Sequence, residues 1–208
     1  MIIKAQHHRI VYPFFKFYAK WKIFRNFESV HFSGEYSEKG LPLLLIANHV
    51  SWWDGFWVNY LNQKLLKRKF YFMMLEEQLK KYPFFVKSGG YSVKKGNRSI
   101  LESIQYTAEI LKEPGNAVLL FPQGKIQSAY ESSIEFEKGI EKVLETADNK
   151  TQVIFIVNLT DYFSNPKPGL FIYYKEYAGN SRKMAALQEE YSSFYHSCIS
   201  EQKKKNDL

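Results

Sequence analysis

The chain has 208 residues, 45% of them hydrophobic, which predicts one globular domain with a continuous core and excludes a largely disordered protein. The net charge of +8 predicts a negatively charged partner, and the aromatic content of 17% favours anionic lipid over nucleic acid or a phosphorylated substrate. The single cysteine, Cys198, excludes an internal disulfide and a multi-cysteine metal site.

Residues 1–27 are predicted to form an amphipathic helix at a membrane interface. Apolar side chains recur along this segment at helical spacing: Ile10, Phe14, Phe17, Trp21 and Phe24. Arg9, Lys16 and Lys20 lie on a flank of the same helix, a combination typical of helices that lie in a bilayer interface. The sequence leaves open the alternative that this apolar stripe packs on the protein's own core.

The same segment lacks both the apolar core of a signal peptide and the run of about 20 apolar residues that spans a bilayer. We therefore expect a peripheral membrane protein rather than a transmembrane one.

Strands and helices alternate along residues 28–208, which are predicted to form the domain that follows the N-terminal helix. Short apolar runs predict strands at 29–32, 41–47, 69–74, 91–93, 117–121 and 152–157. Helical patterns are found at 53–61, at 76–88 with a break at Pro83, from 99 to the Pro114-Gly115 pair, at 135–146 and at 184–198. This order predicts a single α/β domain with a mixed, mostly parallel sheet flanked by helices.

The segment NHVSWWD, residues 48–54, lies where a buried strand gives way to a helix, a common place for active sites in open α/β sheets. His49 is a candidate general base, and Asp54 is a candidate carboxylate that orients the imidazole. The pairing requires His49 in the turn and Asp54 in the first helical turn. On spacing alone, a packed or surface histidine with an aspartate at a helix N-terminus is the favoured interpretation.

Three further short motifs, here called blocks, favour the catalytic interpretation of NHVSWWD instead. Together with it they follow the order of four blocks in the lysophosphatidic acid acyltransferase (1-acylglycerol-3-phosphate O-acyltransferase) family of HxxxxD type, which the chain resembles. The resemblance covers about residues 27–157. The first family block, NHxSxxD, is matched in full by Asn48, His49, Ser51 and Asp54. In the second block, PFFVKSGGYSVKK, Lys95 takes the place of the family's arginine, which keeps the charge and loses the bidentate fork.

The third and fourth blocks depart further from the family pattern. The family reads FPEGTRS where this chain reads FPQGKIQS from Phe121, so Gln123 and Ile126 replace a glutamate and an arginine; Lys138-Gly139 follows downstream. The fourth block, an apolar strand bearing a proline, is represented only by VIFIVN at 153–158.

The resemblance implies a glycerolipid acyltransferase-like fold and a mechanism. His49 would deprotonate a hydroxyl that attacks the thioester of an acyl-CoA or acyl carrier protein, with Asp54 stabilising the imidazolium and with no metal, cofactor or covalent acyl-enzyme. Six residues are expected to bind substrate: Asn48, Ser51, Lys95, Gln123, Gly124 and Lys125. Backbone amides near Gly124 are candidate donors to the tetrahedral intermediate.

The departures bear on the acceptor, because the family's glutamate and arginine are associated with glycerol phosphate. Ile126 cannot pair with a phosphate, and Gln123 is neutral. We therefore hypothesise an acceptor that lacks phosphate, such as a lyso-amino-acid lipid or a phenolic or polyene pigment precursor. The alternative is a true lysophosphatidate acyltransferase of phospholipid synthesis.

Two rivals belong to other classes of protein. A nucleic-acid-binding module is suggested by the basic segment SVKKGNRS, but the positive residues are dispersed rather than gathered along one aromatic strand face, so we expect no nucleic-acid partner. A non-catalytic lipid-binding relative is suggested by the altered third block, and the intact His49 and Asp54 argue against it. The expected location is the cytoplasmic face of a bacterial inner membrane, on anionic lipid.

Overall fold

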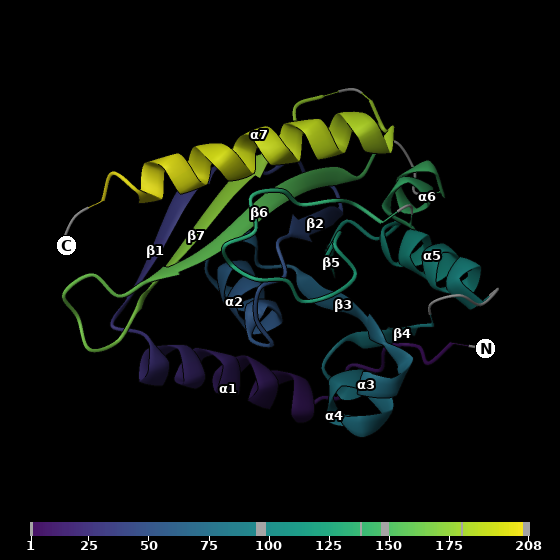
Figure 1. The fold of residues 1–208 in the computed structure, drawn as a ribbon. Coiled ribbons are helices and arrows are strands. Elements are labelled where there is room, and N and C mark those ends of the chain that lie inside the picture. Colours follow the sequence, from purple (N-terminus) through teal and green to yellow (C-terminus); the bar gives the residue numbers. More distant parts are fainter. Residues whose placement is uncertain (1, 95–98, 138, 147–149, 180, 206–208) are drawn as a thin grey trace.

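In a computed structural model, residues 2–94, 99–137, 139–146, 150–179 and 181–205 are described. They form one seven-stranded sheet with helices on both faces (Figure 1). The strands are β1 (Ser29–Glu35), β2 (Leu43–Ala47), β3 (Lys69–Leu75), β4 (Gly90–Val93), β5 (Asn116–Leu120), β6 (Gln152–Asp161) and β7 (Gly169–Glu176). Their order is β1-β7-β6-β2-β5-β3-β4, and every neighbouring pair is parallel except β6 and β7. The predicted mixed, mostly parallel sheet is confirmed.

The helices divide between the two faces of the sheet. They are α1 (Val11–Asn26), α2 (Asp54–Leu61), α3 (Glu76–Lys81), α4 (Phe84–Lys87), α5 (Ser99–Ile110), α6 (Gly139–Thr146) and α7 (Met184–Gln202), with a π-helical turn, η1 (Asn62–Leu66), after α2. Helices α5, α6 and α7 contribute to one hydrophobic core, and α1 to α4 contribute to the other. Helices α1 and α7 therefore lie on opposite sides of the sheet (Figure 1).

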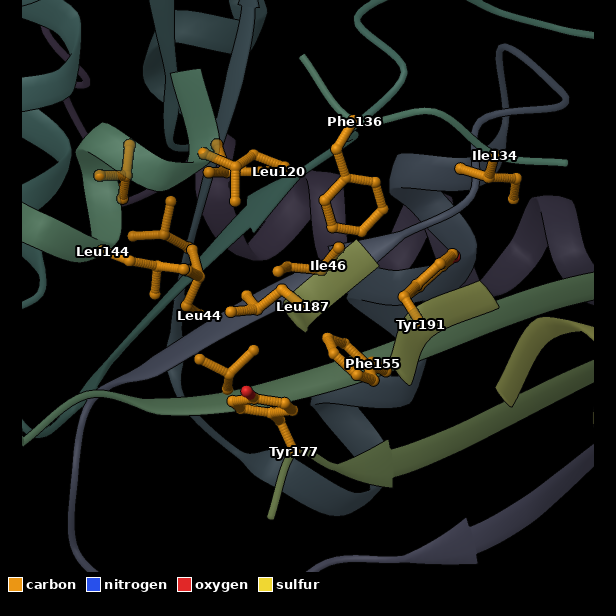
Figure 2. Packing of buried hydrophobic residues seen from close by; sticks show 14 of the residues in the cluster. Leu44, Ile46, Leu120, Ile134, Phe136, Leu144, Phe155, Tyr177, Leu187 and Tyr191 are labelled. Carbon is orange, nitrogen blue, oxygen red and sulfur yellow. The ribbon is translucent and has the colours of Figure 1, made fainter. Parts of the chain in front are cut away.

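Side-chain alternation along the central strand β2 explains why a continuous apolar run was needed there. Leu44 and Ile46 point into the core beneath α6 and α7, shown in Figure 2, whereas Leu43 and Leu45 point into the core beneath α1 and α2. All five residues of β2 are completely buried. A strand covered on both faces has no polar face, which is why its sequence is apolar throughout.

Most predicted elements are found with small shifts at their ends, but the helix predicted over residues 1–27 begins only at Val11. Residues 2–8 are in neither a helix nor a strand, because their backbone pairs with another segment: the Gln6 N–H donates to the Val86 carbonyl and the Ser92 N–H donates to the Ile3 carbonyl. The helix predicted at 76–88 is two helices, α3 and α4, separated at Pro83 as expected. The helix predicted from residue 135 begins at Gly139. Strand β7 is absent from the sequence prediction; residues 162–168 join it to β6 as an antiparallel hairpin, and the Pro166, Pro168 and Gly169 turn residues were its available signal.

Helix α1 is attached to the protein by one face only. Phe15, Ala19 and Ile23 are buried against the sheet core. The apolar stripe predicted from the sequence lies on the exposed side, with fractional exposures of 74% at Ile10, 62% at Phe14, 66% at Phe17, 42% at Trp21 and 57% at Phe24. The alternative that this stripe packs on the core is therefore wrong. Within the described part of the chain, no helix is long and apolar enough to cross a membrane.

Candidate active site

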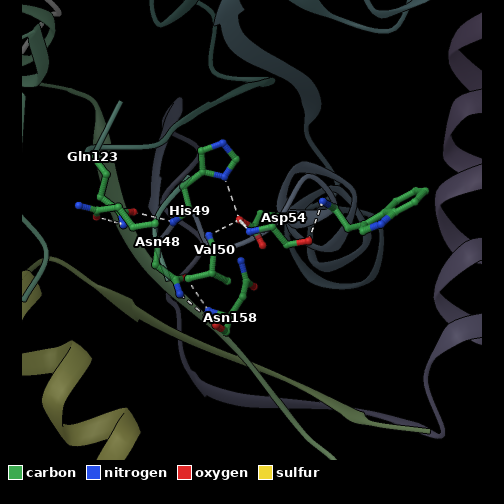
Figure 3. A network of polar contacts seen from close by, with 9 residues as sticks. Asn48, His49, Val50, Asp54, Gln123 and Asn158 are labelled. Carbon is green, nitrogen blue, oxygen red and sulfur yellow. Dashed lines mark hydrogen bonds and ion pairs between the residues drawn. The ribbon is translucent and has the colours of Figure 1, made fainter. Parts of the chain in front are cut away.

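His49 lies two residues beyond the carboxyl end of β2, in the turn that leads to α2. Its Nδ1 is 2.9 Å from Oδ2 of Asp54, the first residue of α2 (Figure 3). Since a carboxylate accepts, the proton on this side belongs to Nδ1, and Nε2 carries the lone pair. Nε2 points away from Asp54 in Figure 3, so the imidazole is held in the tautomer that a general base requires.

Asp54 is completely buried and is fixed by three donors. Its Oδ2 accepts from His49 Nδ1 and from the backbone N–H groups of Val50, at 2.7 Å, and Ser51, at 2.8 Å. Burial raises the pKa of the Asp54 carboxyl, and the three donated hydrogen bonds oppose this rise because they favour the carboxylate. The turn is thus wrapped around one carboxylate oxygen, which explains why five residues separate the two members of the pair.

The other two residues of the first block hold the turn in place. The Asn48 side chain, buried at the end of β2, donates to the Asn158 carbonyl over 3.0 Å and accepts from the Asn158 N–H over 2.8 Å (Figure 3). The Ser51 hydroxyl accepts from the Trp53 N–H over 3.2 Å. Asn48 therefore continues the pairing of β2 with β6 by one residue, through its side chain.

The third block follows β5, the parallel neighbour of β2, so it meets the first block at the same edge of the sheet. Gln123 is buried, and its Oε1 accepts from the His49 N–H over 2.6 Å. The ring of Phe121 stacks on the His49 imidazole, with centroids 3.9 Å apart and an interplanar angle of 10°. The structure thus brings the first and third blocks together around His49.

The remaining third-block residues differ in their surroundings. Gly124 has a φ of +61°, a left-handed conformation that glycine adopts without strain, and its N–H donates to the Phe121 carbonyl over 3.1 Å. The amide of Gly124 is therefore already used within the turn, which counts against the expectation that it binds the tetrahedral intermediate. Lys125 is exposed and Ile126 is half-exposed. Lys125 forms no ion pair with any residue that the structure describes.

Two residues of the predicted blocks cannot be placed relative to His49. Lys95, the substrate-binding residue of the second block, and Lys138 of the third block lie outside the described residues. Among the described residues, no group of three or more His, Cys, Asp or Glu side chains could hold a metal ion.

Comparison with known proteins identifies the family. The family model described as "Acyltransferase" matches residues 29–158, a span that includes all four blocks. The chain belongs to the acyltransferase family. A solved structure with the same fold is the 1-acyl-sn-glycerophosphate (LPA) acyltransferase PlsC from Thermotoga maritima, with a TM-score of 0.57 and 14% sequence identity. The match covers 93% of this chain and 80% of that chain. A search of curated proteins found no significant match.

Three residues of this candidate site were not selected from the sequence. Phe121 stacks on the His49 imidazole, Gln127 donates its N–H to the His49 carbonyl over 2.9 Å, and Asn158 pairs with Asn48. Phe121 and Gln127 belong to the third block, so the block itself was the available signal. Asn158 is the last residue of the fourth block, but its pairing with Asn48 could be recognised only after β6 was known to lie beside β2.

Proposed function

We propose that this acyltransferase moves an acyl chain from acyl-CoA or acyl carrier protein to a hydroxyl group of a lipid-like acceptor. The observation that carries this proposal is the His49–Asp54 pair, with Nδ1 bound to a buried carboxylate and Nε2 directed away from it at the carboxyl edge of the parallel strands. This arrangement suits proton abstraction from a hydroxyl group by Nε2.

The chemistry is a direct transfer in two steps. His49 Nε2 takes the hydroxyl proton while the oxygen attacks the thioester carbonyl, and Asp54 stabilises the imidazolium that forms. Collapse of the tetrahedral intermediate breaks the carbon–sulfur bond, and the departing thiolate takes the proton from the imidazolium. The sequence of steps requires no metal, no other cofactor and no covalent acyl-enzyme.

The side chains around the base favour an acceptor with an apolar or aromatic body. Phe121 covers one face of the imidazole, Ile126 precedes the residue that binds the His49 carbonyl, and Trp52 is 38% exposed in the same turn. Gln123 is neutral and is engaged with backbone. We therefore propose an acceptor without phosphate, such as a lyso-amino-acid lipid or a phenolic or polyene precursor, with lysophosphatidate as the competing acceptor.

We further propose that the protein works as a peripheral protein on anionic lipid, at the cytoplasmic face of the inner membrane. Helix α1 exposes four large apolar side chains, the preceding Ile10 exposes a fifth, and there is no acidic residue between Val11 and Asn26. Its cations lie over aromatic rings, including Lys20 over Phe24 and Arg25 over Trp21. Aromatic and basic side chains on one exposed helix suit the interface of an anionic bilayer.

The test is thiol release from a panel of acyl-CoAs, and then from acyl carrier protein, in the presence of vesicles. Lysophosphatidate and phosphate-free hydroxyl acceptors are offered in parallel to the wild type and to His49→Ala. We expect turnover with a phosphate-free acceptor that is lost in the variant. Activity confined to lysophosphatidate would overturn the acceptor proposal. Retention of an oligonucleotide with no turnover of any pair would favour a binding protein instead.

A further inference from the structure

Two glutamines of the third block hold the backbone of His49 from both sides. The His49 N–H donates to Gln123 Oε1, and the His49 carbonyl accepts from the Gln127 N–H. The Gln123 amide nitrogen in turn donates to Gln127 Oε1. These three hydrogen bonds close a ring around the backbone of His49, which we call the glutamine clasp.

The chemistry of the donors fixes the orientation of both amides. A backbone N–H can only donate, so the oxygen of Gln123 must face His49 and its nitrogen must face Gln127. Gln127 must then present its oxygen. Gln123 is 4% exposed, and its oxygen and nitrogen both already have partners within the protein. It therefore has little capacity left to bind an acceptor.

We propose that Gln123 and Gln127 are positioning residues, which set the place of the His49 imidazole through its backbone, and that Gln123 is not an acceptor ligand. This inference rests on the proposed role of His49 as the base. Asp54 fixes the ring of His49 through Nδ1, and the clasp fixes the chain from which the ring projects. Both are needed because a misplacement of about 1 Å costs on the order of 100-fold in rate.

The first test separates turnover from acceptor binding. Gln123→Ala removes the acceptor of the His49 N–H, so we expect kcat to fall about 10- to 100-fold with the acceptor KM unchanged. A raised acceptor KM with an unchanged kcat would identify Gln123 as an acceptor ligand and overturn the proposal. The matched control is Gln188→Ala, because Gln188 Oε1 accepts the Phe136 N–H over 2.8 Å, a bond of the same kind on α7. This control should leave kcat within about twofold.

The second test uses the pairing of the two amides. In Gln123→Glu, the carboxylate still accepts from His49, and the Gln127 amide can rotate to donate to it. In Gln127→Glu, the new carboxylate accepts from the Gln123 amide. Each single variant should keep kcat within about fivefold, whereas the double variant sets two carboxylates against each other and should fall to the level of Gln123→Ala. A double variant equal to the product of the singles would contradict the clasp.

The third test does not depend on activity. Amide hydrogen exchange, followed by mass spectrometry, is compared for peptides covering residues 48–53 in the wild type, Gln123→Ala and Gln188→Ala. We expect faster exchange in Gln123→Ala alone, because only this variant frees the His49 N–H. Unchanged exchange would overturn the clasp whatever the enzyme does. Faster exchange in a protein with no turnover would instead support the clasp and count against the proposed function.

Discussion

The turn at His49 and helix α1 differ in how their side chains are used. In the turn, Asn48, His49, Ser51 and Asp54 each form a hydrogen bond within the protein through their side chains, and Asn48 and Asp54 are completely buried. On α1, large apolar side chains are exposed, and the cations lie against rings. The proposed catalytic role of the turn depends on the exact placement of a few atoms, whereas the proposed membrane binding by α1 depends on the area and charge of its exposed surface. Their contributions to activity should therefore be separable.

The largest effect is expected at the buried carboxylate. Asp54→Asn keeps the volume of the side chain but removes the charge that stabilises the imidazolium and selects the tautomer of His49, so kcat/KM should fall on the order of 10³- to 10⁴-fold. Thiol release measures this loss, and vesicle sedimentation should show unchanged membrane binding. An equal loss of binding would mean that the two regions are not independent.

The apolar stripe of α1 should affect binding instead. Phe17→Ser with Phe24→Ser removes two side chains that are 66% and 57% exposed. If each inserts into the interface, partition into anionic vesicles should drop about tenfold per residue, while turnover of a water-soluble acceptor stays within about twofold. Leu101→Ser is the matched control, because Leu101 is 54% exposed on α5, away from α1. An equal loss of vesicle binding in Leu101→Ser would contradict the claim that the protein binds the membrane through α1.

The cations of α1 should contribute a smaller, lipid-dependent part. Lys16→Gln with Lys20→Gln should weaken binding to anionic vesicles about fivefold per charge, since each basic residue near such a surface contributes about 1 kcal/mol. Binding to neutral vesicles should not change. The difference should shrink as salt is raised, because screening acts on exposed charges. A loss that is equal on neutral vesicles would indicate altered folding of the helix rather than electrostatic binding.

The smallest effect concerns how the start of α1 is anchored. His7 lies before α1, with Nε2 2.9 Å from the Phe70 carbonyl and its ring edge-on to Tyr12 and Tyr71. Burial lowers the pKa of His7 from 6.5 to about 4. The His7 imidazole therefore binds a proton more tightly in the unfolded chain than in the folded protein. As a result, the stability that the neutral ring provides is complete above pH 6.5 and is lost as the pH falls towards 4.

Partial exposure of this histidine reduces the expected change to about 1–2 kcal/mol. Urea unfolding at pH 7 and pH 4.5 measures it as the difference between the wild type and His7→Gln. The exposed His196→Gln serves as the control and should follow the wild type. If His7→Gln loses as much stability as the wild type between these pH values, His7 is not the group that titrates.

The sequence was sufficient for the elements whose patterns are local. The apolar run of β2 and the helical stripe of α1 were predicted, because strand burial and helical spacing are properties of neighbouring residues. The His49–Asp54 pairing was predicted only from the family resemblance, because the spacing alone favoured a packed or surface histidine. Strand β7 was missed, although a turn rich in proline precedes it. The glutamine clasp and the Asn48–Asn158 pair could not be predicted, because they depend on which strands lie beside β2, and β5 and β6 are both distant in sequence.

The most direct test of the central claim is transfer of a labelled acyl chain to lipid by vesicle-bound protein, with product and bound fraction measured in one sample. Wild type, His49→Ala and Asp54→Asn are compared with the α1 variant Phe17→Ser/Phe24→Ser. We predict labelled product from the wild type, almost none from the two turn variants at an equal bound fraction, and a loss in the α1 variant that follows its lower bound fraction. Transfer by bound His49→Ala at the wild-type rate would contradict the account.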